Sequence, residues 1–412
     1  MGRATVLVVL ASLVGFPGAP GPALAEQAQN TLTKQEVADG WLLLFDGKTL
    51  FGWENHGDGK WKVVDGTLVC EEGAGGWLGT TTEFADCILK CQYRISKTGN
   101  SGIFVRAKRD TNRPHIDGYE IQVCDDHPRN PTGSVYGVIS TKRPGAKCVT
   151  AVEKWQDVEI RVDGNRFRVI LNGTKVVDDC DKRPGPGGRP GKFTRGHVGV
   201  QYHNPGMKIE YRNIKLKPLG TKPLFNGKDL TGWTPHPGRP GKFTVEPGGV
   251  LHAVGGLGSI WAPGEYKDFV LQLDGKTAKE GYQNSGVFFR SIPEQFLQGY
   301  EVQIFNKCRN GDRTKPVDWG TGAIYKRQAV RWVYPENGEW FSMTLVAHGK
   351  HMATWVNGNQ VTDWTDTRRM HANPRRGCRT DAGKIMLQSH DRHSNLSFRN
   401  IRLAEYAEVP SK

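Results

Sequence analysis

Polar and apolar residues alternate along many short stretches of the chain. The alternation is strict in Asp157–Val162 and looser in Arg166–Leu171, and a period of two residues is typical of half-buried β-strands. Asn172-Gly173 follows the second stretch, and Asn357-Gly358 occurs later in the chain; this dipeptide is typical of two-residue hairpin turns. No segment keeps a helical period. The pattern therefore predicts an all-β fold, and so many short strands favour two-sheet sandwiches of the jelly-roll type.

The second half of the chain repeats the first. Five sequence blocks return in the same order, 180 to 187 residues later. The matched blocks are Leu44–Trp53 with Leu224–Trp233, Asn100–Arg106 with Asn284–Arg290, Gly118–Val123 with Gly299–Ile304, Val200–His203 with Leu387–His390, and Arg212–Ile214 with Arg399–Ile401. Each copy is too long for a solenoid repeat and is a whole domain. The sequence therefore predicts two tandem domains, at residues 38–218 and 222–406, with almost no linker, so that they pack against each other.

The first 25 residues predict a secretory signal peptide. Arg3 provides a positive start, Val6–Val14 forms an apolar core of nine residues, and Ala23-Leu24-Ala25 offers a small-residue cleavage site. The core is shorter than the about 20 residues that a membrane-spanning helix needs, and no other segment is long and apolar enough. A retained interfacial anchor is the alternative. We expect an exported protein of the periplasm, the cell surface or the extracellular space.

The net charge of +14 raises the question of an anionic partner. Basic residues are scattered, and the densest groups, Arg368-Arg369 and Arg375-Arg376, lie in stretches whose glycine and proline are typical of loops. Solvated loop charge is the simplest interpretation, and attachment to an acidic cell surface is the alternative. Nucleic-acid binding is not expected, because no basic stripe interleaved with aromatic residues is evident.

Eight cysteines are compatible with an oxidising compartment. Cys87 and Cys91 have the same parity on a predicted strand and would lie about 13 Å apart, which is too far for a disulfide. The second half has only Cys308 and Cys378, so the one disulfide that the sequence predicts joins these two. No CxxC pair occurs, and a structural zinc site is therefore not expected.

Three repeated strands carry polar residues on one face and apolar residues on the other, if each strand is regular. The polar residues are Asn100, Arg106, Glu120, Gln122, Gln201 and His203 in the first copy, and Asn284, Arg290, Glu301, Gln303, Gln388 and His390 in the second. A merely solvated sheet face is the alternative, but such faces carry interchangeable side chains, whereas these residues are identical in the two copies. We predict a ligand-binding face in each domain, with amide, guanidinium and carboxylate groups that suit the hydroxyls of a sugar.

The repeated blocks resemble those of a known family. The motifs Leu-Phe-Asn/Asp-Gly-Lys-x-Leu-x-Gly-Trp, Asn-Ser-Gly-Ile/Val-Phe-x-Arg, Gly-Tyr-Glu-x-Gln and the closing Arg-Asn-Ile are similar to those of the 3-keto-disaccharide hydrolase domain, in both copies and over nearly all of the mature chain. The resemblance implies a concanavalin-like jelly roll that acts on 3-keto-glycosides. Members act as hydrolases, as a 1,2-lyase, or as a hydratase of the resulting 3-keto-2-hydroxy-glucal.

Chemistry of this kind needs a base whose pKa lies near the working pH. The ketone at C3 acidifies the hydrogen on C2, a base removes that hydrogen, the C1 substituent leaves by elimination, and water adds to the enone. The expected roles are base or acid for His203 and His390, partner of the base or ligand of sugar or metal for Glu120 and Glu301, oxyanion stabilisation for Arg106 and Arg290, proton relay for Tyr136 and Tyr325, and substrate binding for Asn100, Gln122, Gln201, Asn284, Gln303 and Gln388.

Other interpretations stay open at this level. A glutamate and a histidine on adjacent strands could hold a divalent cation that acts as a Lewis acid, although one of each is a thin ligand set. The main alternative to an enzyme is a non-catalytic, lectin-like carbohydrate-binding protein, and a scaffold or surface-attachment protein is a third class.

The copies also differ beside the predicted sites. Cys124–His127 in the first copy stands where Phe305–Cys308 stands in the second. The two sites could therefore prefer different sugars, or one could bind while the other reacts.

Overall fold

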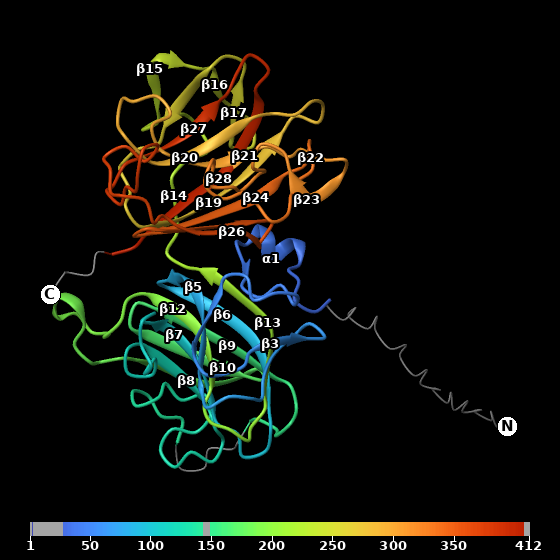
Figure 1. Cartoon of the computed structure of the whole chain (residues 1–412), viewed down its shortest axis with the longest axis vertical. Helices are drawn as coiled ribbons and strands as arrows, with labels where there is room; N and C mark the ends of the chain where they lie inside the picture. The colour runs from blue at the N-terminus through green and yellow to red at the C-terminus, as the bar shows by residue number, and fades with distance from the viewer. Residues whose placement is uncertain (1, 3–27, 143–148, 408–412) are drawn as a thin grey trace.

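The protein consists of two β-sandwiches stacked along its long axis (Figure 1). The structure is a computed structural model and describes residues 2, 28–142 and 149–407. Apart from Gly2, the predicted signal peptide at residues 1–25 lies outside the described residues, as does Cys148. The described helices are α1 (Lys34–Ala38) and the 3-10 turn η1 (Pro186–Gly188), and neither has the length and apolarity needed to cross a bilayer. Strands form the rest of the regular structure, which confirms the all-β prediction.

The first sandwich packs a five-stranded sheet against a larger one. The five-stranded sheet has the order β2 (Trp53–Gly57), β5 (Gly76–Phe84), β12 (Gly196–Tyr202), β7 (Ser101–Ala107) and β8 (Tyr119–Val123). The opposite sheet has the order β11 (Thr174–Cys180), β10 (Arg166–Leu171), β9 (Gln156–Asp163), β6 (Cys87–Ile95) and β13 (Ile209–Pro218), with β4 (Thr67–Cys70) beside β13 and β3 (Lys62–Val64) beside β4. The core lies between the two sheets and includes Ile103 of β7 and Ile160 of β9.

The second sandwich repeats this arrangement. Its five-stranded sheet has the order β15 (Thr234–Pro240), β18 (Gly258–Trp261), β27 (Lys384–Ser389), β20 (Ser285–Ser291) and β21 (Tyr300–Ile304). The opposite sheet has the order β26 (Asn359–Thr365), β25 (His351–Val356), β24 (Phe341–His348), β19 (Phe269–Thr277), β28 (Asn395–Glu405), β17 (Val250–Val254) and β16 (Phe243–Glu246), with β14 (Lys222–Pro223) on β28. A hairpin of β22 (Cys308–Arg309) and β23 (Asp312–Pro316) is added after β21. The sequence repeat is therefore a repeat of the fold.

A two-residue strand joins the sandwiches. β1 (Leu42–Leu43) pairs antiparallel with β13 of the first sandwich and parallel with β26 of the second, so that 16 strands form one sheet across both domains. The Trp355 indole N–H donates a hydrogen bond to the Leu43 carbonyl oxygen over 3.2 Å. The Arg331 guanidinium donates to Asp46 Oδ2 over 2.6 Å. The two domains therefore pack directly against each other.

Alternation in the sequence becomes alternation in burial. On β9 the side chains of Val158, Ile160 and Val162 are buried, and the residues between them are exposed or half-buried. In the two Asn-Gly turns, φ is +47° and +77° at Asn172-Gly173 and +49° and +73° at Asn357-Gly358. Positive φ at both central residues is what a type I′ hairpin requires. The strand and both hairpin predictions are confirmed.

The predicted Cys308–Cys378 disulfide is wrong, because both residues are free thiols. The Tyr300 hydroxyl, at the start of β21, contacts the Cys378 thiol, whereas Cys308 lies beyond the other end of that strand. A strand of this length spans about 16 Å, and a disulfide needs Cα atoms within about 7 Å. Cys87 and Cys91 are buried on one face of β6, as their parity predicted.

Candidate active site

In the first domain, the predicted polar face is the face of the five-stranded sheet that points away from the core. The side chain of Glu120, on β8, lies over Gly102 of β7, where an added Cβ would come within 2.1 Å of Glu120 Oε1. The second copy repeats this arrangement with Glu301 over Gly286, where the corresponding separation is 2.5 Å. The glycine of the repeated Asn-Ser-Gly motif therefore leaves room for the carboxylate beside it.

Glu120 is a buried carboxyl group with no nearby positive charge to offset its burial. Its side chain is 4% exposed, and no other described side chain pairs with its carboxylate. Burial in a low-dielectric environment disfavours the charged form and raises the pKa of Glu120 to about 8. A carboxyl group whose pKa lies near neutrality is suited to general acid or base chemistry.

Amide side chains lie near this glutamate on the same sheet face, and the carbonyl oxygens of two of them have no hydrogen-bond partner. The Gln122 amide N–H donates to Asn100 Oδ1 over 3.3 Å. The carbonyl oxygens of Gln122 and Gln201 are buried and have no hydrogen-bond partner among the described residues. The same is true of Gln303 and Gln388, at the matching positions of the second copy. Buried polar atoms are normally paired, so the repetition of this defect points to a ligand that completes the hydrogen bonds.

Tyr136 and His203 lie toward the outer part of the first site. The Tyr136 backbone N–H donates to the Glu120 carbonyl oxygen over 2.8 Å. Edge contacts place the Tyr136 ring between His115 and His127, at centroid separations of 5.9 and 5.5 Å. His203 is exposed, and its Nδ1 contacts Asn204 Oδ1 at 2.9 Å.

Sequence reasoning missed His115 and His127. Burial lowers the pKa of His115, and the charges of Arg113 and His203 lower it further. His115 is therefore a neighbour of His203. Neither His115 nor His127 has a histidine counterpart in the second copy, so the repeat gave no signal for them.

Arg106 and Arg290 do not belong to these sites. Between β12 and β7, His197 lies opposite Ala107 but Gly199 lies opposite Phe104, so β7 contains one extra residue. This β-bulge gives Arg106 a φ of +54°, and a bulge redirects the side chains of its strand. The prediction that Arg106 shares a face with Asn100 assumed a regular strand and is wrong.

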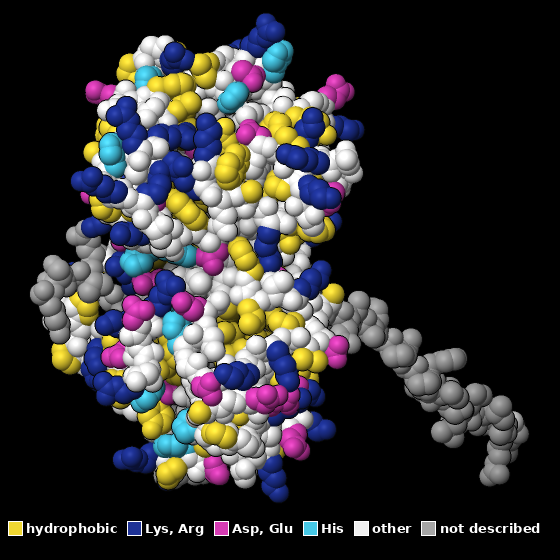
Figure 2. Space-filling view, in the orientation of Figure 1, with side chains coloured by type: hydrophobic (Ala, Val, Ile, Leu, Met, Phe, Trp, Pro, Cys, Tyr) yellow, Lys and Arg dark blue, Asp and Glu magenta, His cyan; other side chains and the backbone are white. Residues whose placement is uncertain are grey.

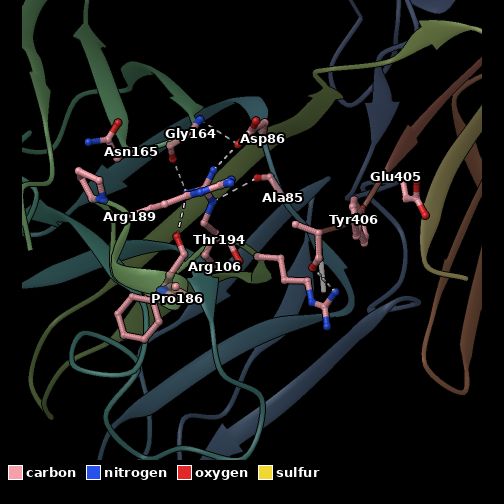
Figure 3. A pocket seen from close by; sticks show the side chains of 16 residues that line it. Ala85, Asp86, Arg106, Gly164, Asn165, Pro186, Arg189, Thr194, Glu405 and Tyr406 are labelled. Atoms are coloured by element: carbon pink, nitrogen blue, oxygen red, sulfur yellow. Dashed lines mark hydrogen bonds and ion pairs between the residues drawn. The ribbon is translucent and has the colours of Figure 1, made fainter. Parts of the chain in front are cut away.

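The Arg106 side chain is structural. Its guanidinium donates to Asp86 Oδ1 over 2.5 Å and to the carbonyl oxygens of Gly164 and Phe193 over 2.7 and 2.9 Å (Figure 3). Arg290 repeats the arrangement, with a φ of +46° and an ion pair to Asp268 of 3.1 Å. The predicted role of both arginines in stabilising an enolate is therefore wrong as well.

The second domain has a cavity of about 480 Å³ at the corresponding place. Its lining contains six of the predicted residues and several that the sequence reasoning missed. The predicted residues are Asn284, Glu301, Gln303, Tyr325, Gln388 and His390, and the further ones include Phe288, Lys326, Arg327 and Arg375. The residues that parity predicted on three strands and one turn therefore lie together, apart from Arg290, which the bulge displaces.

Arg375 makes the second site electrostatically different from the first. It reaches the site from the loop between β26 and β27, and its Nη2 donates to Glu301 Oε2 over 2.8 Å. The guanidinium lies 5.1 Å from the ring centroid of Phe288 and 5.9 Å from that of Tyr325. Burial raises the pKa of Glu301, and the positive charge of Arg375 opposes this shift. Arg375 lies in a loop without periodicity, so no sequence pattern indicated where its side chain would go.

Among the described residues, no group of three or more His, Cys, Asp or Glu side chains is placed to hold a metal ion.

Comparison with known proteins agrees with the motif resemblance. The family model described as the 3-keto-alpha-glucoside-1,2-lyase-like domain matches residues 40–217 and again residues 220–404. A 3-keto-disaccharide hydrolase of Bacteroides thetaiotaomicron is 30% identical over 235 residues, which cover 44% of this chain and 79% of that protein. The resemblance stated from the repeated motifs is therefore confirmed.

Similar solved structures include proteins of two kinds. A protein of Parabacteroides distasonis, named as a proposed glycosyl hydrolase, is 24% identical with a TM-score of 0.40, over 47% of this chain and 100% of its own. The carbohydrate-binding module CBM66 of Bacillus subtilis is 17% identical with a TM-score of 0.31, over 40% of this chain and 94% of its own.

Proposed function

Since both halves of the chain belong to the family of 3-keto-alpha-glucoside-1,2-lyase-like domains, we propose that the protein cleaves 3-keto-glycosides and that its first domain carries out the reaction. The observation that supports the first domain is Glu120, a buried carboxyl group with no compensating charge and a pKa of about 8. The relative named as a 3-keto-disaccharide hydrolase supports the substrate class.

In the proposed reaction, the ionised Glu120 takes the proton from C2 of the sugar. The electron pair of the C2–H bond moves toward the C3 ketone, and the enolate then expels the C1 substituent. The departing oxygen takes up a proton, so that the products of this elimination are an enone and a free alcohol or sugar. Addition of water to the enone gives the net products of hydrolysis. A base with a raised pKa is well matched to a weakly acidic C–H group near neutral pH.

Amide groups take over the role once assigned to Arg106. Among the described residues, the side-chain N–H groups of Asn100 and Gln201 make no hydrogen bond, so they are free to donate to the developing enolate oxygen. The unpaired carbonyl oxygens of Gln122 and Gln201 would accept hydrogen bonds from sugar hydroxyls.

The exposed position of His203 supports a role different from the one expected from the sequence. We assign the base to Glu120 and the proton delivered to the leaving group to His203. Tyr136, between two histidines, would relay protons from solvent.

The experiment is a turnover assay with a 3-keto-glucoside that follows enone absorbance and release of the C1 substituent. Glu120→Gln keeps the shape of the side chain and removes its basicity, and we expect turnover to fall by roughly 10³-fold, within the usual range for a lost general base. Glu301→Gln is the matched variant in the second copy and should leave most of the turnover. Equal activity of Glu120→Gln and the wild-type protein would refute the assignment.

A lectin-like role is the second candidate, and one observation favours it for the second domain only. There the glutamate is already neutralised by Arg375 at 2.8 Å, which lowers its availability as a base. In this variant of the proposal the first domain reacts and the second binds.

We further propose export, on the basis of the N-terminal segment alone. Fractionation of cells followed by N-terminal sequencing tests it, because a mature protein that begins at about residue 26 outside the cytoplasm is expected from the cleavage pattern. An intact N-terminus on a cytoplasmic protein would contradict it.

A further inference from the structure

The pocket of the second domain carries basic side chains that the first domain lacks. Both copies have a short turn downstream of the strand of the buried glutamate, and the same bridge closes it at residues 135 and 139 and at residues 324 and 328. Inside the turn, Gly137-Val138 of the first copy is replaced by Lys326-Arg327 in the second. The second copy therefore adds two positive charges to the wall of its pocket.

The charge of Arg327 is held in place without being neutralised. The Arg327 guanidinium donates to the carbonyl oxygens of Lys326 and Arg375 over 3.1 and 3.0 Å. In the described part of the chain, neither Lys326 nor Arg327 forms an ion pair with a carboxylate. An arginine offers five N–H donors, and these two bonds leave three of them for a ligand.

The balance of charge along this wall is positive. Glu301 is the only carboxylate in the described lining, which also contains Lys326, Arg327 and Arg375. The carboxylate of Asp318 accepts hydrogen bonds from Asn284 and Gln303 over 3.0 and 2.8 Å, so three positive charges stand against two negative ones. Arg375 already occupies the carboxylate of Glu301. On the surface, Lys and Arg side chains gather on the second domain over β20 and β27 (Figure 2).

Neutral polar groups complete the pocket. Gln303 and Gln388 are 1% and 3% exposed, and their carbonyl oxygens have no partner among the described residues. A sugar hydroxyl would satisfy each of them, as in the first domain.

We propose that the second domain binds an acidic sugar unit, in which the hydroxyls meet Gln303 and Gln388 and a carboxylate faces Lys326 and Arg327. That the ligand is a sugar rests on the proposed function, whereas its negative charge rests on the basic wall of this pocket. The ligand class is therefore a uronic acid or a glycoside that contains one, in contrast to the neutral sugar expected in the first domain.

The test compares the binding of methyl glucuronide and methyl glucoside to the full-length mature protein by isothermal titration calorimetry. The glucuronide should bind at least tenfold more tightly at low ionic strength, and the difference should shrink as salt screens the charges. The double variant Lys326→Gly with Arg327→Val installs the residues of the first copy and should abolish the difference. Lys97→Gly with Lys154→Val removes the same charge from exposed loops of the first domain and should preserve it.

Every other pattern of affinities would overturn the proposal. Binding of the glucuronide that is equal to or weaker than that of the glucoside, including no measurable binding of either sugar, would refute an acidic ligand. A preference that survives in the Lys326/Arg327 variant places the anion elsewhere. Tighter binding of glucose 6-sulfate than of the glucuronide overturns the carboxylate assignment. These are binding measurements with sugars that carry no 3-keto group, so they are independent of the turnover assay that tests the proposed function.

Discussion

The two domains place the same glutamate over the same glycine, but they give it opposite electrostatic surroundings. Glu120 stands without a charged partner and has a pKa of about 8, whereas Glu301 is paired with Arg375 at 2.8 Å. The strands that position the two carboxylates are equivalent, and the difference comes from the loop between β26 and β27 and from the turn after β21. The comparison teaches that the sandwich fixes where the glutamate lies and that the loops decide what it can do.

The largest expected difference between the copies is in stability at high pH. Burial raises the pKa of Glu120 from 4.5 to about 8, so its contribution to stability is complete below pH 4.5 and is lost as the pH rises through about 8. At about 1.4 kcal/mol per pKa unit, Glu120→Gln should raise the free energy of unfolding by about 5 kcal/mol at pH 9. Chemical denaturation at pH 4, where both forms are neutral, is the control and should show little change.

Glu301→Gln sharpens this comparison. Because Arg375 stabilises the ionised form of Glu301, the variant should gain less stability at pH 9 than Glu120→Gln does. Equal gains would mean that the Arg375 pair does not distinguish the two sites.

Arg106 and Arg290 should behave alike, because both are buried arginines at a bulge, each paired with a carboxylate. Arg106→Ala and Arg290→Ala should each lower the free energy of unfolding by about 3 kcal/mol, since each leaves a carboxylate and several carbonyl oxygens without their partner. Denaturant unfolding measures this, and the exposed pair of Arg166 with Asp178 provides the control, where Arg166→Ala should cost below about 1 kcal/mol. A large loss of turnover per folded molecule in Arg106→Ala would contradict its exclusion from the site.

The pH dependence of turnover tests which copy reacts. If the ionised Glu120 is the base, kcat/KM rises about tenfold per pH unit well below pH 8 and levels off above it, which is roughly 50-fold between pH 6 and pH 8. The profile should be unchanged in Glu301→Gln. A rate that falls over this interval would make Glu120 the acid instead of the base.

The smallest expected effect comes from removing the charge beside Glu301. Arg375→Met should raise the pKa of Glu301 further, because one charge-assisted hydrogen bond of about 1.5 kcal/mol is lost. Titration of the carboxyl carbon by NMR measures it. Arg376→Met, at the exposed neighbouring residue, is the control and should leave the titration where it was.

Much of this architecture could be predicted from residue patterns. Alternation located β9 and its buried Val158, the Asn-Gly dipeptides located two hairpins, and the repeat separated the domains. Parity on β8 and β21 placed each glutamate beside its glutamine, because a regular strand has a period of two. The same rule failed at Arg106, where one inserted residue in β7 reversed the direction of the side chain. A bulge leaves no periodic signal, and neither does the loop that carries Arg375.

Chemistry was harder to predict than geometry. The choice of histidine as base rested on ordinary pKa values, and the burial that moves the pKa of Glu120 depends on residues from several strands. The Cys308–Cys378 disulfide was inferred because these are the two cysteines of the second half. The number of cysteines says nothing about the distance between them.

The two-residue strand β1 has a consequence for separating the two domains. Leu42–Leu43 lies between β13 and β26 and pairs with both, so each half covers a sheet edge of the other. Expression of either half alone would leave a β-strand edge of the large sheet open, and open edges recruit other strands. The separated halves should therefore associate with each other or with themselves, whereas the intact chain keeps these edges covered.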